Sequence, residues 1–379
     1  QGSFGPFARV DGEWSNHFSG NSDYFDVAAS SDFAFGTGDF TVELFIKTSD
    51  PSADSYDRRM YLNDGPDGNA IGNIMLLLVA ASPNSGKVGV QTNGLIITSS
   101  TVVTDGAWHH VAMVRSSGTL SLYIDGTSEG TPVSNTDNIT ANSGSPRPRI
   151  GSYGAAGGDF NGYVSNLRVL SSALYTSNFT PPTSALTAIT NTKLLTCQSN
   201  QFKDNSASGH TLTRTTSGAG FTPSISAFTP FLTSEVYDSA VNGASAYFDG
   251  SGDYLSAADS ADWTLGDTFT IEAWVNPHQN ETYNTVVEQN GASGFYYSVI
   301  GNPPTSMQFY KGIGGGVQVD SATLPQMSEQ WNHVAFVVSG GTGYHYINGV
   351  RSGSSGSISI GDIGTALQIG QQGSSYPYK

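Results

Sequence analysis

Two glycine-rich turns carry the residue types of a calcium site. Asp249 and Asp253 lie at the ends of the string DGSGD, and the earlier string SGNSD places Ser19 and Asp23 at the same two positions. Calcium prefers carboxylates together with backbone carbonyls, which a glycine-rich turn can direct inward. Asp249, Asp253 and Asp23 are therefore candidate metal ligands and calcium is the candidate cofactor, although such strings more often close a turn without any metal.

Four tyrosines lie where a loop could present an aromatic ring to a sugar. Tyr153 and Tyr376 each follow an Ile-Gly pair, whereas Tyr283 and Tyr296 lie in or near variable connections. The face of an exposed aromatic ring stacks on a sugar, and nearby amides and carboxylates bind the hydroxyl groups. These four tyrosines are the candidate glycan-binding residues.

Acid–base catalysis has weaker support in the sequence. Glycosidases use two carboxylates about 5 to 10 Å apart, which on one strand means acids at alternate positions. Glu43 and Glu272 are instead single acids in strand-like segments, and we interpret each as part of a solvated strand face. Because acids from separate strands could still converge, a glycan-cleaving enzyme stays open as an alternative, with no catalytic residue assigned.

The adjacent His109 and His110 do not indicate a shared metal ion, because neighbouring residues of a strand point to opposite faces. The later string WNHVAFV keeps the second histidine as His333 and has Asn332 in place of the first. We interpret His110 as a histidine that forms hydrogen bonds within the protein, beside Trp108.

Strands are the elements that must position these residues. Apolar residues occupy alternate positions in segment 40–46 (FTVELFI) and in segment 120–124 (LSLYI), which is the period of a half-buried strand. The pairs Asp125-Gly126 and Asn348-Gly349 follow such segments and favour tight hairpin turns. The pattern predicts antiparallel sheets.

The same ordered set of strings occurs twice. FTVELFI at 40–46 returns as FTIEAWV at 269–275, WHHVAMV at 108–114 as WNHVAFV at 331–337, and YIDG at 123–126 as YING at 346–349. Along this alignment Lys379 corresponds to Phe160, so the second copy stops before a counterpart of NGYVSNLRVL. We expect the chain to be part of a longer one, with a strand donated by another subunit as the alternative.

Composition excludes several classes of partner. The chain of 379 residues has 15 Lys and Arg against 31 Asp and Glu, a net charge of −16, which disfavours nucleic acid. The longest apolar run, 74–81, is shorter than the roughly 20 residues of a membrane span, so no membrane insertion is expected. A single cysteine, Cys197, cannot form an intrachain disulfide.

The repeated strings resemble the laminin-G-like jelly roll of the concanavalin A-like lectin/glucanase superfamily. The resemblance rests on FDGSGDYL, FTIEAWV, WNHVAFV and YINGV in the second copy and on FNGYVSNLRVL at the end of the first. It implies an all-β fold of two tandem antiparallel jelly-roll β-sandwiches, the second truncated. Members commonly hold calcium at such rims, whereas the Glu-x-Asp-x-x-Glu strand of the retaining glucanases occurs in neither copy.

The stretch from Ala173, ALYTSNFTPPTSALTAITNTKLLTCQSNQFKDNSASGHTLT, resembles the inter-domain segment of tandem laminin-G-like proteins from marine phages and metagenomes. This resemblance implies a non-enzymatic structural or adhesion protein, a tail fibre or surface decoration, at the virion surface or otherwise extracellular. Its partners would be other virion proteins, further copies of itself, or host-surface glycans. A secreted calcium-dependent lectin is the alternative, and a glycan-cleaving enzyme the second alternative.

The domain boundaries follow from the repeat. We expect a lead-in over 1–15, a first sandwich over 16–220 with an accessory segment at 171–220, a linker over 221–237, and a second sandwich over 238–379 that is incomplete at its C-terminus.

Overall fold

The computed structural model describes residues 2–3, 5–6, 9–50, 57–64, 73–92, 94–140, 147–153, 158–215, 223–232, 244–278, 282–312, 317–323, 327–372 and 376–378. The chain divides into two compact units. The first unit is Arg9–Val236, and the second combines Gln1–Ala8 with Tyr237–Lys379. Residues 1–15, expected as one lead-in, are thus shared between the two units.

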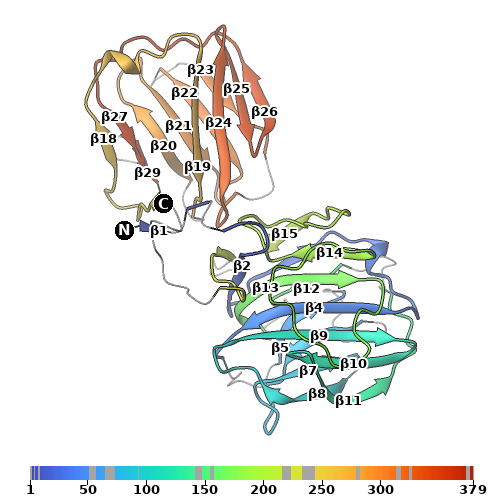
Figure 1. Ribbon diagram of the computed structural model, residues 1–379. Coiled ribbons are helices and arrows are strands. Elements are labelled where there is room, and N and C mark those ends of the chain that lie inside the picture. The colour runs from blue at the N-terminus through green and yellow to red at the C-terminus, as the bar shows by residue number, and fades with distance from the viewer. Residues whose placement is uncertain are drawn as a thin grey trace. The chain divides into compact units, whose positions relative to one another are not determined.

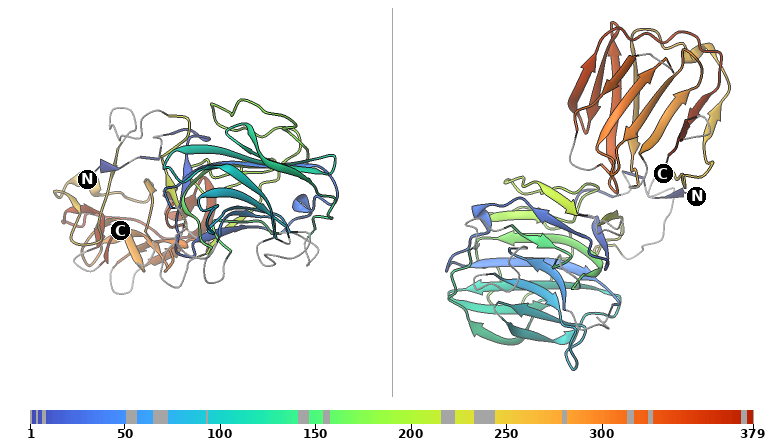
Figure 2. Two further views of the ribbon diagram at one scale, coloured as in Figure 1. Left: turned by 90° about the horizontal axis from the view of Figure 1, so that it is seen from below. Right: turned by 180° about the vertical axis from the view of Figure 1, so that it is seen from behind.

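The first unit is a sandwich of two antiparallel sheets (Figures 1 and 2). Its eight-stranded sheet, which we call the back sheet, has the order β11 (Thr127–Ser134), β10 (Thr119–Ile124), β9 (Trp108–Ser116), β4 (Phe40–Lys47), β13 (Asn161–Leu170), β2 (Ser15–Ser19) and β16 (Ser224–Ser226). Strand β14 (Thr192–Thr196) also pairs with β13. β16 lies within the expected linker 221–237 and pairs with β2.

The seven-stranded sheet of the first unit is its front sheet. Its order is β15 (Leu212–Thr215), β3 (Tyr24–Val27), β12 (Arg149–Ile150), β5 (Arg58–Leu62), β6 (Met75–Leu78), β7 (Lys87–Gln91) and β8 (Leu95–Val102). Alternate residues of both sheets form one core, in which Val42 and Leu44 of the back sheet share a cluster with Phe25 and Ile150 of the front sheet. Each such side chain contributes about 1.5–3 kcal/mol by leaving water.

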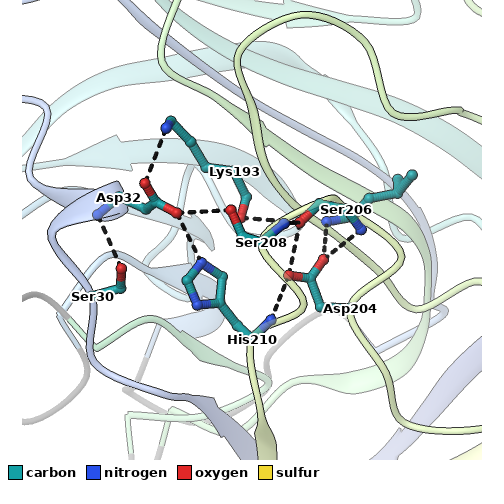
Figure 3. A network of polar contacts seen from close by, with 8 residues as sticks. Ser30, Asp32, Lys193, Asp204, Ser206, Ser208 and His210 are labelled. Atoms are coloured by element: carbon teal, nitrogen blue, oxygen red, sulfur yellow. Dashed lines mark hydrogen bonds and ion pairs between the residues drawn. The ribbon is translucent and has the colours of Figure 1, made fainter.

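The accessory segment completes the first unit. β14 extends the back sheet and β15 the front sheet, and residues of β14 and of the segment between the two strands attach to the 3-10 turn η1 (Ser31–Phe33). Figure 3 shows how Lys193 Nζ and Ser208 Oγ donate to the carboxylate of Asp32, at 3.0 and 2.8 Å, with His210 Nε2 at 3.2 Å. Asp204 accepts backbone N–H groups of the same segment. These contacts make 192–215 an integral part of the sandwich.

The second unit repeats the two-layer plan (Figure 1). Its front sheet has the order β18 (Leu255–Ala257), β27 (Leu367–Ile369), β20 (Tyr283–Gln289), β21 (Phe295–Ile300), β22 (Ser306–Lys311) and β23 (Val317–Asp320). Its back sheet has the order β19 (Phe269–Val275), β24 (Asn332–Ser339), β25 (Thr342–Ile347) and β26 (Val350–Ser355). The minor elements are the pairs β1 (Gly2–Ser3) with β17 (Ser245–Ala246) and β28 (Gln371–Gln372) with β29 (Tyr376–Pro377), and the 3-10 turn η3 (Ala261–Trp263).

The predicted hairpins form at the predicted dipeptides. Asp125 and Gly126 have φ of 48° and 76°, and Asn348 and Gly349 have φ of 50° and 79°. Positive φ at both central residues defines the turn that matches strand twist, which is why Asp, Asn and Gly occupy these positions. The prediction of an all-β chain with antiparallel jelly-roll sandwiches is confirmed.

Strand register shows that corresponding strands of the two back sheets pair in the same way. In the first unit Ala112 lies opposite Glu43 on one side and Tyr123 on the other. In the second unit Ala335 lies in the same way between Glu272 and Tyr346.

The units differ beside the strand that carries this glutamate. β4 lies between β9 and β13, whereas β19 pairs only with β24 among the described residues. In the part of the chain that the structure describes, no helix has the length and apolarity to cross a membrane.

Candidate functional site

The front sheet of the second unit has an outer face of aromatic and polar side chains. Tyr297 of β21 and Phe309 of β22 belong to the core. Their neighbours Tyr296, Gln308 and Tyr310 therefore project from the other face of the sheet, because successive strand residues alternate.

The two tyrosines of this face are cross-strand partners. Tyr296 lies opposite Tyr310, with ring centroids 5.2 Å apart and ring planes inclined by 12°. Both rings are half-buried. Tyr283 of β20 lies opposite Ile300, which shares the orientation of Tyr296, so Tyr283 belongs to the same face.

A hydrogen-bond chain orders the polar groups beside the rings. Tyr296 Oη donates to Gln308 Oε1 at 3.1 Å, and Gln308 Nε2 donates to Asp320 Oδ1 at 2.9 Å. Gln308 is buried and Asp320 is exposed. We call Tyr283, Tyr296, Gln308, Tyr310 and Asp320 the tyrosine face. It combines aromatic rings, a planar amide and a carboxylate, all held by strand backbone.

The corresponding face of the first unit has different chemistry. Outward-facing Met75 and Leu77 of β6 lie opposite Gln91 and Gly89 of β7. Met75 and Leu77 are fully buried, and Gln91 is buried as well. Among the residues that the structure describes, the second unit therefore presents an aromatic surface at this position of the sheet and the first unit does not.

Tyr153 lies instead in a charged cluster of the first unit. Arg149 donates to both carboxylate oxygens of Asp26, at 2.7 and 3.1 Å, and its guanidinium lies 3.9 Å from the centre of the Tyr24 ring. The Arg59 guanidinium lies 5.2 Å from the centre of the Tyr153 ring. Burial lowers the pKa of Arg59, although the negative charges of neighbouring acidic groups act in the opposite direction. The charges of this cluster neutralise one another, which is the behaviour of a structural cluster.

The structure thus brings Tyr283 and Tyr296 together on one face and places Tyr153 in the other unit. Tyr376 lies in β29, but its side chain is outside the described residues. The sequence interpretation missed Tyr310, Gln308 and Asp320. The alternation of MQFYK at 307–311 was the available signal, since it places Gln308 and Tyr310 on the same face of the strand.

The candidate calcium turns are closed by their own carboxylates. Asp23 is fully buried and accepts N–H groups of Ser19 at 2.7 Å and Asn21 at 3.3 Å. Asp253 accepts the N–H of Asp249 at 3.3 Å. No group of three or more His, Cys, Asp or Glu residues is arranged to hold a metal ion in the described ranges. Calcium binding by Asp23, Asp249 and Asp253 stays a prediction.

Glu43 does not lie on a solvated face, so that interpretation is wrong. Its carboxylate is fully buried and accepts from Arg168 Nη2 at 2.6 Å and Tyr175 Oη at 2.8 Å, with His110 Nε2 at 3.0 Å. Burial opposes its ionisation, but the hydrogen bond from His110 and the charge of Arg168 outweigh burial and lower the pKa of Glu43. Glu272 is exposed as expected, with 64% of its side chain accessible.

Comparison with protein families identifies the fold family. The laminin-G type of the concanavalin A-like lectin/glucanases superfamily matches residues 19–178 and 249–379. The chain belongs to this superfamily. Each matched stretch corresponds to one laminin-G-like unit, so the tandem arrangement inferred from the repeat is confirmed. A search of curated proteins finds no match.

Three solved structures are similar to this chain at low sequence identity. Domains LG4-5 of the mouse laminin alpha1 chain are 12% identical, with a TM-score of 0.33, over 96% of this chain and 85% of theirs. The LG1-3 region of the laminin alpha2 chain is 10% identical, with a TM-score of 0.32, over 97% of this chain and 60% of its own length. The CBM40 of the Ruminococcus gnavus IT-sialidase is 14% identical, with a TM-score of 0.32, over 44% of this chain and 95% of its own length.

Proposed function

We propose that this laminin-G-like protein is a non-enzymatic carbohydrate-binding protein and that its second unit binds a glycan on the tyrosine face. The observation that carries the proposal is the cross-strand pair Tyr296 and Tyr310 beside the ordered chain from Gln308 to Asp320. Aromatic rings bind the C–H face of a sugar, and fixed amide and carboxylate groups bind its hydroxyls. Because strand backbone already orders these groups, little side-chain entropy is lost on binding.

Charge narrows the class of glycan. The chain has a net charge of −16, and the acidic group of the face is Asp320. A sialylated or sulfated glycan would be repelled by this field, so a neutral glycan is the expected ligand.

A glycan array probed with the whole chain tests this function. We expect binding to neutral glycans, and Tyr296→Ala and Tyr310→Ala should each weaken it about tenfold, as expected for loss of one stacking surface. Tyr153→Ala in the first unit is the matched control and should leave binding unchanged. Repeating the array with a chelator tests the calcium-dependent lectin, because only that alternative loses binding when calcium is removed. Binding that is insensitive to both tyrosines of the face would contradict the proposal.

We further propose that the protein acts as a virion structural or adhesion component of a marine phage. This finer assignment is supported by the sequence resemblance of the segment that starts at Ala173. Its folding onto the first unit through β14 and β15 suits a rigid module. Mass spectrometry of purified particles tests the assignment: peptides of this chain should co-purify in stoichiometric amount, and their absence from particles would favour a secreted lectin.

A further inference from the structure

The hydrogen-bond chain of the tyrosine face has a fixed direction, which Asp320 sets. Gln308 of β22 lies directly opposite Asp320 of β23. An ionised carboxylate only accepts hydrogen bonds, whereas a side-chain amide has a donor end and an acceptor end. The amide therefore turns its Nε2 toward Asp320, where it donates to Oδ1 at 2.9 Å, and its Oε1 faces away from Asp320.

The orientation of the amide in turn fixes the hydroxyl of Tyr296. Tyr296 pairs with Tyr310, so its contact with Gln308 is a diagonal one between neighbouring strands. Because Oε1 only accepts, Tyr296 Oη uses its single proton to donate to Gln308 at 3.1 Å. A further hydrogen bond to Tyr296 Oη then has to come from a donor.

The surroundings of Gln308 preserve this direction. Ser298 lies opposite Gln308 on its other side, but the Ser298 hydroxyl is hydrogen-bonded to Thr285 Oγ1 at 3.0 Å. Gln308 itself is only 6% exposed, and hydrogen bonds are electrostatically stronger in a buried environment than in water. The amide is therefore held in one orientation.

The hydroxyl of Tyr310 lies outside this chain. Tyr310 contacts Tyr296 through its ring, and among the described residues no hydrogen bond orients the Tyr310 hydroxyl. Rotation of that hydroxyl lets it donate or accept. Tyr296, by contrast, faces a ligand as an acceptor, and the exposed carboxylate of Asp320 is a second acceptor.

We infer that the tyrosine face selects neutral glycans whose free hydroxyl groups donate hydrogen bonds to Tyr296 Oη and to the Asp320 carboxylate, and that Gln308 is the positioning residue that sets this selectivity. The inference rests on the proposed glycan binding and specifies which groups of the glycan are recognised. An ether, an ester or a fluorine in place of a donating hydroxyl offers no proton and leaves an acceptor of the face unpaired. The bond to Asp320 is charge-assisted and therefore stronger than one between neutral groups.

Fluorinated sugars test this selectivity, because fluorine is close in size to a hydroxyl group but cannot donate a hydrogen bond. The probes are the methyl glycosides of glucose, galactose and mannose, intact and with each hydroxyl in turn replaced by fluorine. Fluorine and proton NMR titrations with the whole chain give the dissociation constants. We expect an intact glycoside to bind, and its analogues fluorinated at the donating positions to bind at least about tenfold more weakly. Fluorine at the other positions should change the affinity less than about threefold.

Substitutions that remove the direction of the chain should reduce this discrimination. Tyr296→Phe keeps the aromatic ring and removes the acceptor, and Asp320→Asn supplies an amide that lets the Gln308 amide reverse. In both variants we expect the ratio of the dissociation constants, fluorinated over intact, to fall from about ten to about three or less. Tyr310→Phe is the matched control and should leave the ratio unchanged. A purely structural effect would weaken both ligands and leave the ratio as it was.

Gln308→Met tests the positioning residue itself, since methionine has a similar volume and forms neither hydrogen bond. We expect the same fall in the ratio at the position that Tyr296 recognises. Because Asp320 is exposed, Asp320→Asn should fold even where the substitution of the buried Gln308 does not, and thermal melting verifies this.

Two results would overturn the inference and leave glycan binding intact. The first is equal binding of an intact glycoside and all its fluorinated analogues. The second is a ratio that Tyr296→Phe and Asp320→Asn leave unchanged. Absence of binding by all three intact glycosides up to about 10 mM would also overturn it. The glycan array then decides whether the proposed function fails as well.

Discussion

A buried histidine distinguishes the core of the second unit from that of the first. His345 occupies the inward position that corresponds to Leu122, next to the equivalent tyrosines of β10 and β25. Its Nε2–H donates to the carbonyl of Val319 at 2.9 Å, and its Nδ1 has no hydrogen-bond partner among the described residues. Burial lowers the pKa of His345, against the opposing hydrogen bond. Burial therefore favours the neutral form of the His345 ring in the folded state.

Protonation of His345 at low pH should lower the stability of the second unit. Because the folded-state pKa is lowered from 6.5, the unfolded state binds the proton more tightly, and stability falls as pH drops from about 6.5 through the folded-state pKa. We expect the melting temperature of the second unit to fall between pH 7.5 and 5, and His345→Leu to remove this slope. Calorimetry across that range measures it, and an unchanged slope in the variant would contradict the assignment.

His109 provides a control of opposite sign in the first unit. Its hydrogen bond to Asp125 outweighs burial, and with the added bond to Asp105 its pKa is raised above 6.5. The charged form of His109 therefore contributes fully to the stability of the first unit below about pH 6.5. This contribution is lost as the pH rises through the raised pKa. His109→Asn, which copies Asn332 of the second unit, should flatten that dependence.

At the scale of elements, β13 and the residues that follow it, 171–179, decide the environment of the Glu43 carboxylate. Glu43 and Glu272 hold the same register position in corresponding strings, yet among the described residues Glu43 has three side-chain partners and Glu272 has a single histidine. The difference comes from residues more than a hundred positions away along the chain. Secondary structure alone does not distinguish the two glutamates.

The matched substitutions Glu43→Gln and Glu272→Gln measure this difference. Glu43→Gln leaves the buried guanidinium of Arg168 without its counter-charge and should cost the first unit about 3 kcal/mol or more. Glu272→Gln changes an exposed side chain and should cost less than about 0.5 kcal/mol. Urea denaturation of the two variants provides the comparison, and equal costs would show that the ion pair does not stabilise the first unit.

At the scale of the whole molecule, each unit has its own hydrophobic core. Among the described residues, the back sheet of the first unit has eight strands and that of the second has four. The second unit also exposes large apolar side chains, including Tyr247 at 56% and Leu255 at 55%. Less apolar surface is therefore buried per residue in the second unit, which lowers its expected stability.

Calorimetry of the whole chain should accordingly show two transitions. The transition at lower temperature should belong to the second unit and should be the one that His345→Leu alters. A single cooperative transition would show that the two units unfold as one.

Much of the fold was predictable because its determinants are local. The period-two alternation of 40–46 and the Asp-Gly and Asn-Gly turns act within a few residues, and the repeat of these strings establishes the two units. Tyr283 and Tyr296 could also be selected, from their residue type and position, as aromatic residues that could stack on a sugar. Neither residue, however, indicates its neighbours.

The sequence by itself determined that the chain is acidic, all-β and duplicated, because composition, alternation and turn chemistry are properties of short segments. Only the tertiary structure decided that Tyr296 lies beside Tyr310, Gln308 and Asp320, since strand pairing joins β21, β22 and β23. It also decided that Glu43 is buried and Glu272 exposed. The burial of a side chain depends on which distant segment covers its face of the sheet, and the sequence of the strand itself does not specify that segment.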